Sequence, residues 1–91
     1  MTAVLVTYDL NTPGQDYTVL HKAIKEAGAS WCRPLESTWI VGGYGITASG
    51  VKATLLPLID SNDRLLVVDI TGDSYSGWLT QEVWDWIKLW V

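Results

Sequence analysis

The residue best placed to do chemistry in this sequence is Asp9, which lies at the end of an apolar run. Residues 4–11 read VLVTYDLN, and the apolar part predicts a buried strand. Burying a lone carboxylate in a strand costs several kcal/mol unless it is paired, hydrogen-bonded or bound to a metal. Two interpretations of Asp9 therefore stand. It is either a structural strand end, hydrogen-bonded to backbone N–H groups or paired with Arg64, or it is a metal ligand.

Other side chains that often carry chemistry have plainer explanations here. His21 falls on the outward side of a predicted helix among lysines, with no second catalytic group at helical spacing, so a solvated histidine is expected. Cys32 has no partner for metal or nucleophile chemistry and is expected to be a small buried residue. Ser37 and Thr38 are chemically able to bind phosphate, but strand packing explains them more simply. Residues 42–45 (GGYG) lack the Lys-Ser/Thr ending of a phosphate loop.

The composition predicts one soluble domain with an acidic balance. The 91 residues are 48% apolar, enough for a single core. Ten acidic residues against six basic ones give a net charge of -4, which argues against strong non-specific binding to nucleic acid. A local basic patch stays open as an alternative, from Lys22, Lys25, Arg33, Lys52 and Arg64.

The same totals bear on location. No apolar run approaches the roughly 20 residues of a membrane span, and the first residues lack a signal-peptide pattern. The one cysteine excludes an internal disulfide. We therefore expect a cytoplasmic protein that does not enter a membrane.

The order of predicted elements is β-α-β-β-α-β, which is the ferredoxin-like pattern of an α+β domain with an antiparallel sheet. A strand over about residues 2–10 is apolar on both faces and should be central. A helix follows, capped by Thr12 or Asp16 and ended by Gly28 as a C′ glycine. A hairpin over about 29–35 and 37–41 has Pro34 on its edge strand. A weak helix over about 47–59 leads to a strand over 64–71, expected to be buried on both faces for most of its length.

The ferredoxin-like arrangement leaves one sheet face bare, and the end of the chain is expected to cover it. Four of the six tryptophans follow residue 77, and the chain has no phenylalanine. Thr80 is expected to cap a helix to about Trp90 that is apolar over more than one side. We expect a ferredoxin-like domain over residues 1–71. Residues 72–91 should form a Trp-rich C-terminal loop and helix on the bare face, on a dimer partner, or on both.

Three short stretches on this element order resemble a known family. They are residues 7–10 (TYDL), 33–39 (RPLESTW) and 63–67 (DRLLV). The resemblance is to the small CRISPR-associated family that bridges the two integrase dimers during spacer acquisition, whose members were also described as metal-dependent nucleases. Residues 9–17 and 71–73 also resemble a group of short prokaryotic proteins on this scaffold, some labelled SinR-like. The RNA-cutting virulence-associated protein D toxins are similar in scaffold too.

The resemblance implies a homodimer in which two copies stack their sheets. The two copies of Asp9 would approach each other at the two-fold axis and share Mg²⁺ or Mn²⁺, which makes Asp9 the implied catalytic residue and metal ligand. Carboxylate oxygens and water are the ligands that such hard cations take. Arg33, Ser37 and Arg64 are the implied contacts to RNA or DNA.

Two function hypotheses follow. In the first, the protein is a divalent-metal-dependent endonuclease, a phosphodiesterase acting on RNA or DNA, and the motif at Asp9 favours it. In the second, it is a non-catalytic dimeric module that uses its acidic, Trp-bearing C-terminal region for a protein partner. The negative charge and the lack of an evident general base favour the second.

Overall fold

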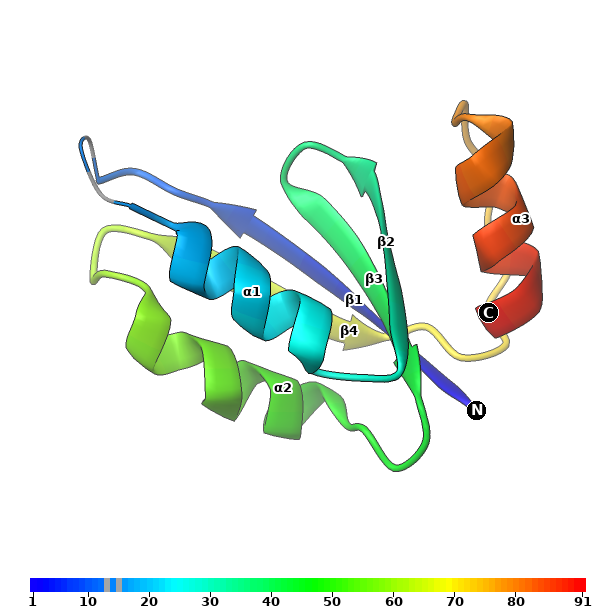
Figure 1. The fold of residues 1–91 in the computed structure, drawn as a ribbon, viewed down its shortest axis with the longest axis horizontal. Coiled ribbons are helices and arrows are strands. Elements are labelled where there is room, and N and C mark those ends of the chain that lie inside the picture. Colours follow the sequence, from blue (N-terminus) through cyan, green and yellow to red (C-terminus); the bar gives the residue numbers. More distant parts are fainter. Residues whose placement is uncertain (13, 15) are drawn as a thin grey trace.

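The computed structural model describes residues 1–12, 14 and 16–91. Within them an antiparallel four-stranded sheet with strand order β2-β3-β1-β4 is combined with three α-helices and a short 3-10 turn (Figure 1). The elements are β1 (Thr2–Asp9), α1 (Thr18–Glu26), β2 (Ser30–Leu35), β3 (Thr38–Gly43), α2 (Ala48–Leu55), η1 (Leu56–Leu58), β4 (Arg64–Asp69) and α3 (Gln81–Trp90). The predicted α+β class and antiparallel sheet are confirmed.

Strand β1 is central, as its two apolar faces predict. It pairs with β3 on one side and β4 on the other. Because side chains alternate along a strand, Val4, Val6 and Tyr8 point to one face, where all three are buried. Ala3, Leu5, Thr7 and Asp9 point to the other. We call the first the helix face and the second the open face.

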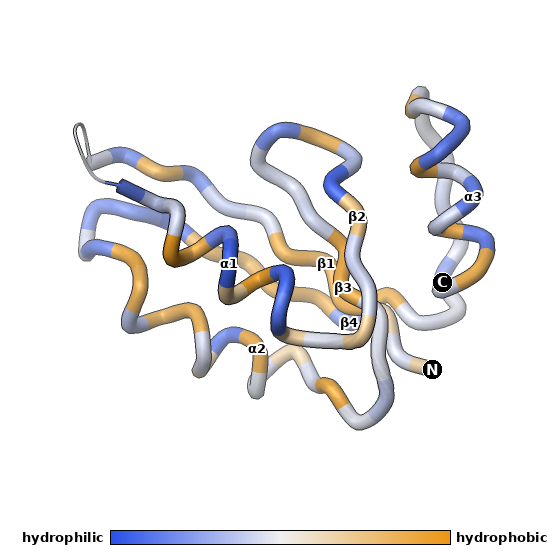
Figure 2. Tube along the Cα trace, in the orientation of Figure 1, coloured by the Kyte–Doolittle hydropathy of each residue, from blue (hydrophilic) through white to orange (hydrophobic). Residues whose placement is uncertain are grey.

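Helices α1 and α2 cover the helix face and supply its core. Leu20, Ile24, Val51 and Leu55 are buried there against the strands. Figure 2 shows α1 alternating between apolar and polar residues, as expected for a helix with one side on a sheet. The two buried residues of α1, Leu20 and Ile24, are four positions apart and so lie on that side.

The residues that cap the two ends of α1 differ in part from the prediction. The N-cap of α1 is Tyr17, which makes no side-chain capping bond, so the prediction of Asp16 as N-cap is one residue early. The Asp16 carboxylate nevertheless accepts a hydrogen bond from the Thr18 backbone N–H at 2.9 Å. The alternative capping box from Thr12 includes Pro13 and Gln15, which lie outside the described residues. Gly28 follows the C-cap residue Ala27 and so lies at the predicted C′ position, but it does not adopt positive φ. A Cβ at Gly28 would lie 2.6 Å from the Gly42 carbonyl oxygen, so close packing requires glycine there.

The hairpin and the two edge strands decide which surfaces stay exposed. β2 is an edge strand, as Pro34 predicts, and its register with β3 shifts between Cys32 and Leu35. The expectation that the strand over 64–71 is buried on both faces is wrong. β4 is the other edge strand, and on the open face Leu66 is 59% exposed and Val68 38% exposed.

Helix α3 covers only part of the open face. It stands at one end of the molecule, apart from α1 and α2 (Figure 1). Ile87 is buried there with Ala3, Cys32 and Ile40. The Trp86 indole N–H donates to the Ser30 hydroxyl at 2.8 Å. No helix in the described part of the chain is long and apolar enough to cross a membrane.

The rest of the open face has no helix over it. We call this region the open half. Its residues are Thr7, Asp9, Leu35, Thr38, Arg64, Leu66 and Val68, which the strand register places together.

Candidate functional site

Asp9 lies on the open half with an exposed carboxylate. Its cross-strand neighbour is Arg64, as the antiparallel pairing of β1 and β4 predicts. The Arg64 guanidinium, however, donates to the carbonyl oxygens of Ser61 at 3.2 Å and Asp63 at 2.9 Å. The structural interpretation of Asp9 included an ion pair with Arg64. Arg64 instead donates hydrogen bonds to backbone carbonyl oxygens.

One chain alone does not fit a magnesium site at Asp9. Hard divalent cations take about six oxygen ligands, usually with more than one anionic group or several waters. In the ranges that the structure describes, no three His, Cys, Asp or Glu side chains gather at metal-binding spacing. Arg64, the cross-strand neighbour of Asp9, also adds a positive charge to this part of the surface. A metal at Asp9 would need ligands from outside this chain.

The buried carboxylate of this region is Asp63, a residue named above only as the first of the stretch 63–67. Its side chain is 5% exposed. It accepts hydrogen bonds from the Asn11 and Asp60 backbone N–H groups, both at 2.8 Å, and from the Tyr17 hydroxyl at 2.9 Å. Burial acts to raise the pKa of Asp63, and these hydrogen bonds outweigh it and hold the pKa below its usual value. The role of Asp63 is structural, because it joins the turn before β4 to the segment after β1.

A hydrogen-bonded aromatic network lies beneath α1. The Trp39 indole N–H donates to the Tyr8 hydroxyl at 3.0 Å, and that hydroxyl lies 3.0 Å from His21 Nε2. Since the Tyr8 oxygen already accepts from Trp39, its own proton is free to donate to His21 Nε2. In that arrangement His21 is neutral and carries its proton on Nδ1.

His21 is therefore less solvated than its place among lysines predicts. The ring is half-buried and packs near Tyr8 and Trp39. Burial, followed by the positive charges of Arg33 and Lys25, lowers the pKa of His21. The helix pattern around His21 does not reveal these contacts, because Tyr8 and Trp39 lie on strands that are distant from the helix in sequence. Cys32 behaves as predicted: it is buried, and desolvation raises the pKa of its thiol to about 11.

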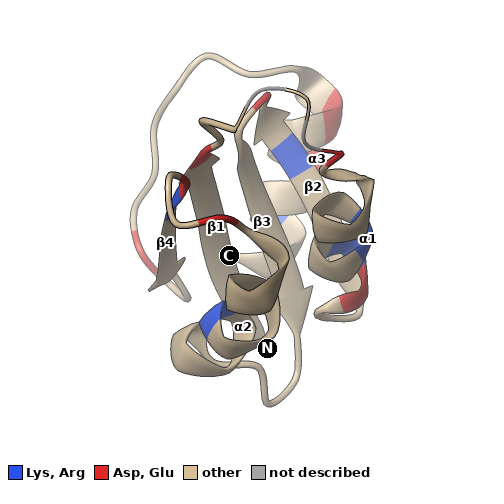
Figure 3. Ribbon diagram, turned by 90° about the vertical axis from the view of Figure 1, so that its left-hand side faces the viewer, with Lys and Arg blue, Asp and Glu red and all other residues tan. Residues whose placement is uncertain are grey.

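The three implied nucleic-acid contacts lie apart. Arg33 faces the helix side, with its Cζ atom 4.7 Å from the Trp39 ring centre and its Nε 2.9 Å from the Glu36 carbonyl oxygen. Ser37 is exposed between β2 and β3, and its carbonyl accepts from the Tyr8 N–H. Arg64 lies on β4 at the opposite edge of the sheet. Figure 3 shows the basic residues distributed over separate elements. The five basic residues named above therefore do not form a single basic patch.

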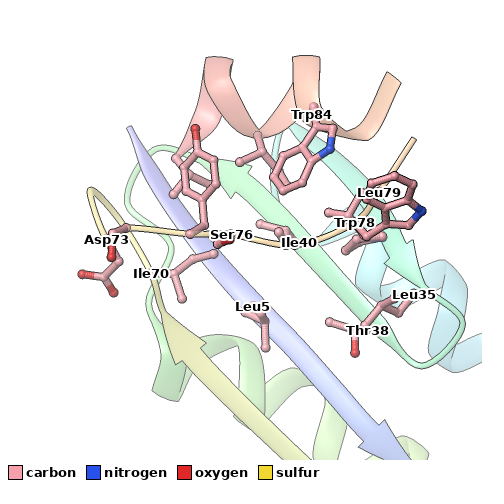
Figure 4. A pocket seen from close by; sticks show the side chains of 16 residues that line it. Leu5, Leu35, Thr38, Ile40, Ile70, Asp73, Ser76, Trp78, Leu79 and Trp84 are labelled. Carbon is pink, nitrogen blue, oxygen red and sulfur yellow. The ribbon is translucent and has the colours of Figure 1, made fainter. Parts of the chain in front are cut away.

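An apolar groove of about 450 Å³ lies between the open face and the segment that leads to α3 (Figure 4). Leu5, Leu35 and Ile40 form its floor, and Tyr75 and Trp84 are among the side chains that line it. Trp78 also lines the groove and is 98% exposed. A groove of this size falls within the range of ligand-binding and peptide-binding sites.

No protein-family model matches this sequence, and no curated protein matches it at a significant level.

Proposed function

We propose that this chain is a homodimeric module with a ferredoxin-like fold, in which two copies pair through the open half of the sheet. The observation that carries the proposal is the exposure of apolar side chains there. Leu35 and Leu66 are 58% and 59% exposed on one sheet face, and Val68 is 38% exposed. An apolar sheet face left without a cover is a typical association surface. The strand order β2-β3-β1-β4, with α1 and α2 on one face, supports the ferredoxin-like assignment.

The charges of the open half favour a second copy as the partner. The chain has a net charge of -4, so two copies repel each other over most of their surface. The open half carries one acidic residue, Asp9, next to one basic residue, Arg64. A two-fold axis makes an interface self-complementary, because each patch meets the same patch of its partner. A surface with one negative and one positive charge is self-complementary, because Asp9 of one copy is able to face Arg64 of the other.

The open face also carries an exposed tryptophan, Trp78, and the apolar groove beside it. A tryptophan that is 98% exposed beside an apolar groove leaves a large apolar area in water. Aromatic residues that enter a partner's pocket often dominate the binding free energy of an interface. In the proposed dimer the Trp78 side chain of each copy is buried against the other. A different protein partner at this Trp-bearing region is the alternative outcome of the test.

Sedimentation velocity of the purified chain tests the dimer. The wild type is expected to sediment as a dimer at about micromolar concentration, which a buried interface of standard size supports. Leu66→Asp should sediment as a monomer, because it replaces an exposed apolar side chain of the open half with a second negative charge. Leu56→Asp is a matched control, since Leu56 is 50% exposed on η1, away from the open half. A wild-type monomer at all concentrations, or equal sedimentation of both variants, contradicts the proposal.

The second candidate is a metal-dependent endonuclease, and the position of Asp9 on the open half favours it. Pairing through this face would bring two Asp9 carboxylates into one interface. Like charges at close range repel unless a cation such as Mg²⁺ or Mn²⁺ neutralises them. The candidate substrates are RNA and DNA. The buried thiol of Cys32 suits a reducing compartment, and we place the protein in the cytoplasm in either case.

A cleavage assay on single-stranded RNA and duplex DNA with magnesium or manganese tests the second candidate. Wild type and Asp9→Ala are purified side by side, with their dimer content compared by sedimentation. Metal-dependent cutting that disappears in a folded, dimeric Asp9→Ala supports an endonuclease. Equal cutting by both points to a contaminating nuclease. No cutting by either, over a range of pH and metals, leaves the module without catalysis.

A further inference from the structure

A cluster of nitrogen-bearing side chains surrounds the buried indole of Trp39 on the helix face. The Arg33 guanidinium carbon lies 4.7 Å from the Trp39 ring centre, and the Lys25 Nζ lies 5.9 Å from it. The His21 ring centre is 5.5 Å away. Trp39 itself is only 1% exposed. The indole therefore forms the floor of a site whose rim is made of His21, Lys25 and Arg33.

Two elements hold this rim in place. His21 and Lys25 are four residues apart on α1 and so lie on the same side of that helix. Arg33 lies on β2, where it sits on the face opposite Cys32 and toward α1. The Lys25 Nζ also lies 4.8 Å from the ring centre of Trp31, which is 39% exposed. Because cations stack on indole faces, the aromatic floor fixes the position of both charges.

The rim keeps hydrogen-bond donors for a ligand. Arg33 donates from Nε and Nη2 to the Glu36 carbonyl oxygen, which leaves Nη1 available and does not cancel the positive charge. His21 accepts from Tyr8 at Nε2, so its Nδ1–H is the remaining donor of the ring. His21 and Arg33 also line a neighbouring cavity of about 320 Å³, together with Asp9 and Glu36, and Lys25 lies outside that lining. Within this cavity Arg33 supplies the positive charge.

We propose that His21, Lys25 and Arg33 form a binding site for a phosphoryl group, either of a small phosphate ester or of a nucleic-acid backbone. Arg and Lys donors recognise phosphate oxygens by charge-assisted hydrogen bonds, and His21 adds a third donor between them. Trp31 is 39% exposed beside Lys25, and an exposed indole of this kind is able to stack a base. The three rim residues lie on the helix face, and none of them belongs to the open half through which the dimer is proposed to form.

An NMR titration with inorganic phosphate, at ionic strength matched with chloride, tests the site. Phosphate is expected to shift the ring and indole resonances of His21 and Trp31 and to raise the pKa of His21. Arg33→Gln and Lys25→Gln should each weaken binding by about fivefold or more, since each removes a charge-assisted hydrogen bond. Lys52→Gln is the matched control, because Lys52 lies on α2 away from the rim, and it should leave the affinity unchanged.

Two outcomes overturn the proposal, and one further probe identifies the source of the phosphate. Absence of saturable shifts at His21 and Trp31, or equal weakening by Arg33→Gln and Lys52→Gln, contradicts the site. A short oligothymidylate is then added as the second probe. Tighter binding than phosphate with the same Arg33 dependence assigns a single-stranded nucleic-acid backbone, whereas weaker binding assigns a small phosphate ester. Sedimentation is measured separately, so failure of this site and failure of the dimer are distinguishable.

Discussion

Removing the Tyr8 hydroxyl is the sharpest test of the network beneath α1. In Tyr8→Phe the ring remains, but the Trp39 indole N–H loses the acceptor that lies 3.0 Å away. Trp39 is 1% exposed, so water has no access to that N–H in the folded state. His21 Nε2 loses its donor as well, although the half-buried ring has access to water. The main cost therefore comes from one orphaned donor in the core.

The expected magnitude follows from that orphaned group. Leaving a buried donor unsatisfied costs about 1–3 kcal/mol of the free energy of unfolding. For a domain of this size, each kcal/mol lowers the melting temperature by about 4–8 °C. Tyr8→Phe should therefore melt roughly 4–24 °C below the wild type. His21→Ala should cost less through this network, because the Tyr8 hydroxyl has the Glu36 carbonyl oxygen at 3.5 Å as a second acceptor.

Urea and thermal unfolding, followed by tryptophan fluorescence and circular dichroism, measure the effect. Tyr44→Phe is the matched control, because Tyr44 is 77% exposed and its hydroxyl is satisfied by water. The control should unfold like the wild type. If Tyr8→Phe is no less stable than Tyr44→Phe, the hydrogen bond from Trp39 does not stabilise the core and the reasoning is refuted.

Three further predictions concern titration and packing. The pKa of His21 is lowered from about 6.5 in the folded protein, so the unfolded chain binds the proton first as the pH falls. The free energy of unfolding should therefore decrease below pH 6.5. His21→Gln should remove this pH dependence, which urea titrations at several pH values measure. Burial raises the pKa of the Cys32 thiol from 9.0 to about 11, so the free energy of unfolding should decrease as the pH rises through that range. The decrease should be less steep in Cys32→Ala. The thiol of the folded protein should react with a thiol reagent only after unfolding. Gly42→Ala should loosen α3, because a Cβ there overlaps the Trp90 ring, and limited proteolysis of residues 72–80 should be faster than in the wild type.

Much of the fold was predictable because local patterns and packing agree. β1 has apolar residues on both faces and is central in the sheet. The Thr80 cap of α3 and the β2–β3 hairpin both follow from short-range spacing. These features depend on residues within a turn or a strand of one another. The amino-acid sequence states them directly.

The errors concern contacts between distant segments. The apolar residues of β4 suggested burial on both faces, but β4 is an edge strand and α3 covers the other end of the open face. The environment of His21 depends on Tyr8, 13 residues away, and that of Asp63 on Asn11 and Tyr17, 52 and 46 residues away. Periodicity says which side of an element is apolar, and it does not say which element will cover that side.

The rule that drew attention to Asp9 applies more strongly to Asp63. A buried carboxylate must be hydrogen-bonded, paired or metal-bound, and Asp63 satisfies it with donors from three segments. Asp9 is exposed at a strand end, so burial makes no demand for a ligand there. A function for Asp9 therefore requires a partner that buries it, and the exposed apolar residues of the open half are the physical reason to expect one. For this reason the oligomeric state must be measured before any test for nuclease activity can be interpreted.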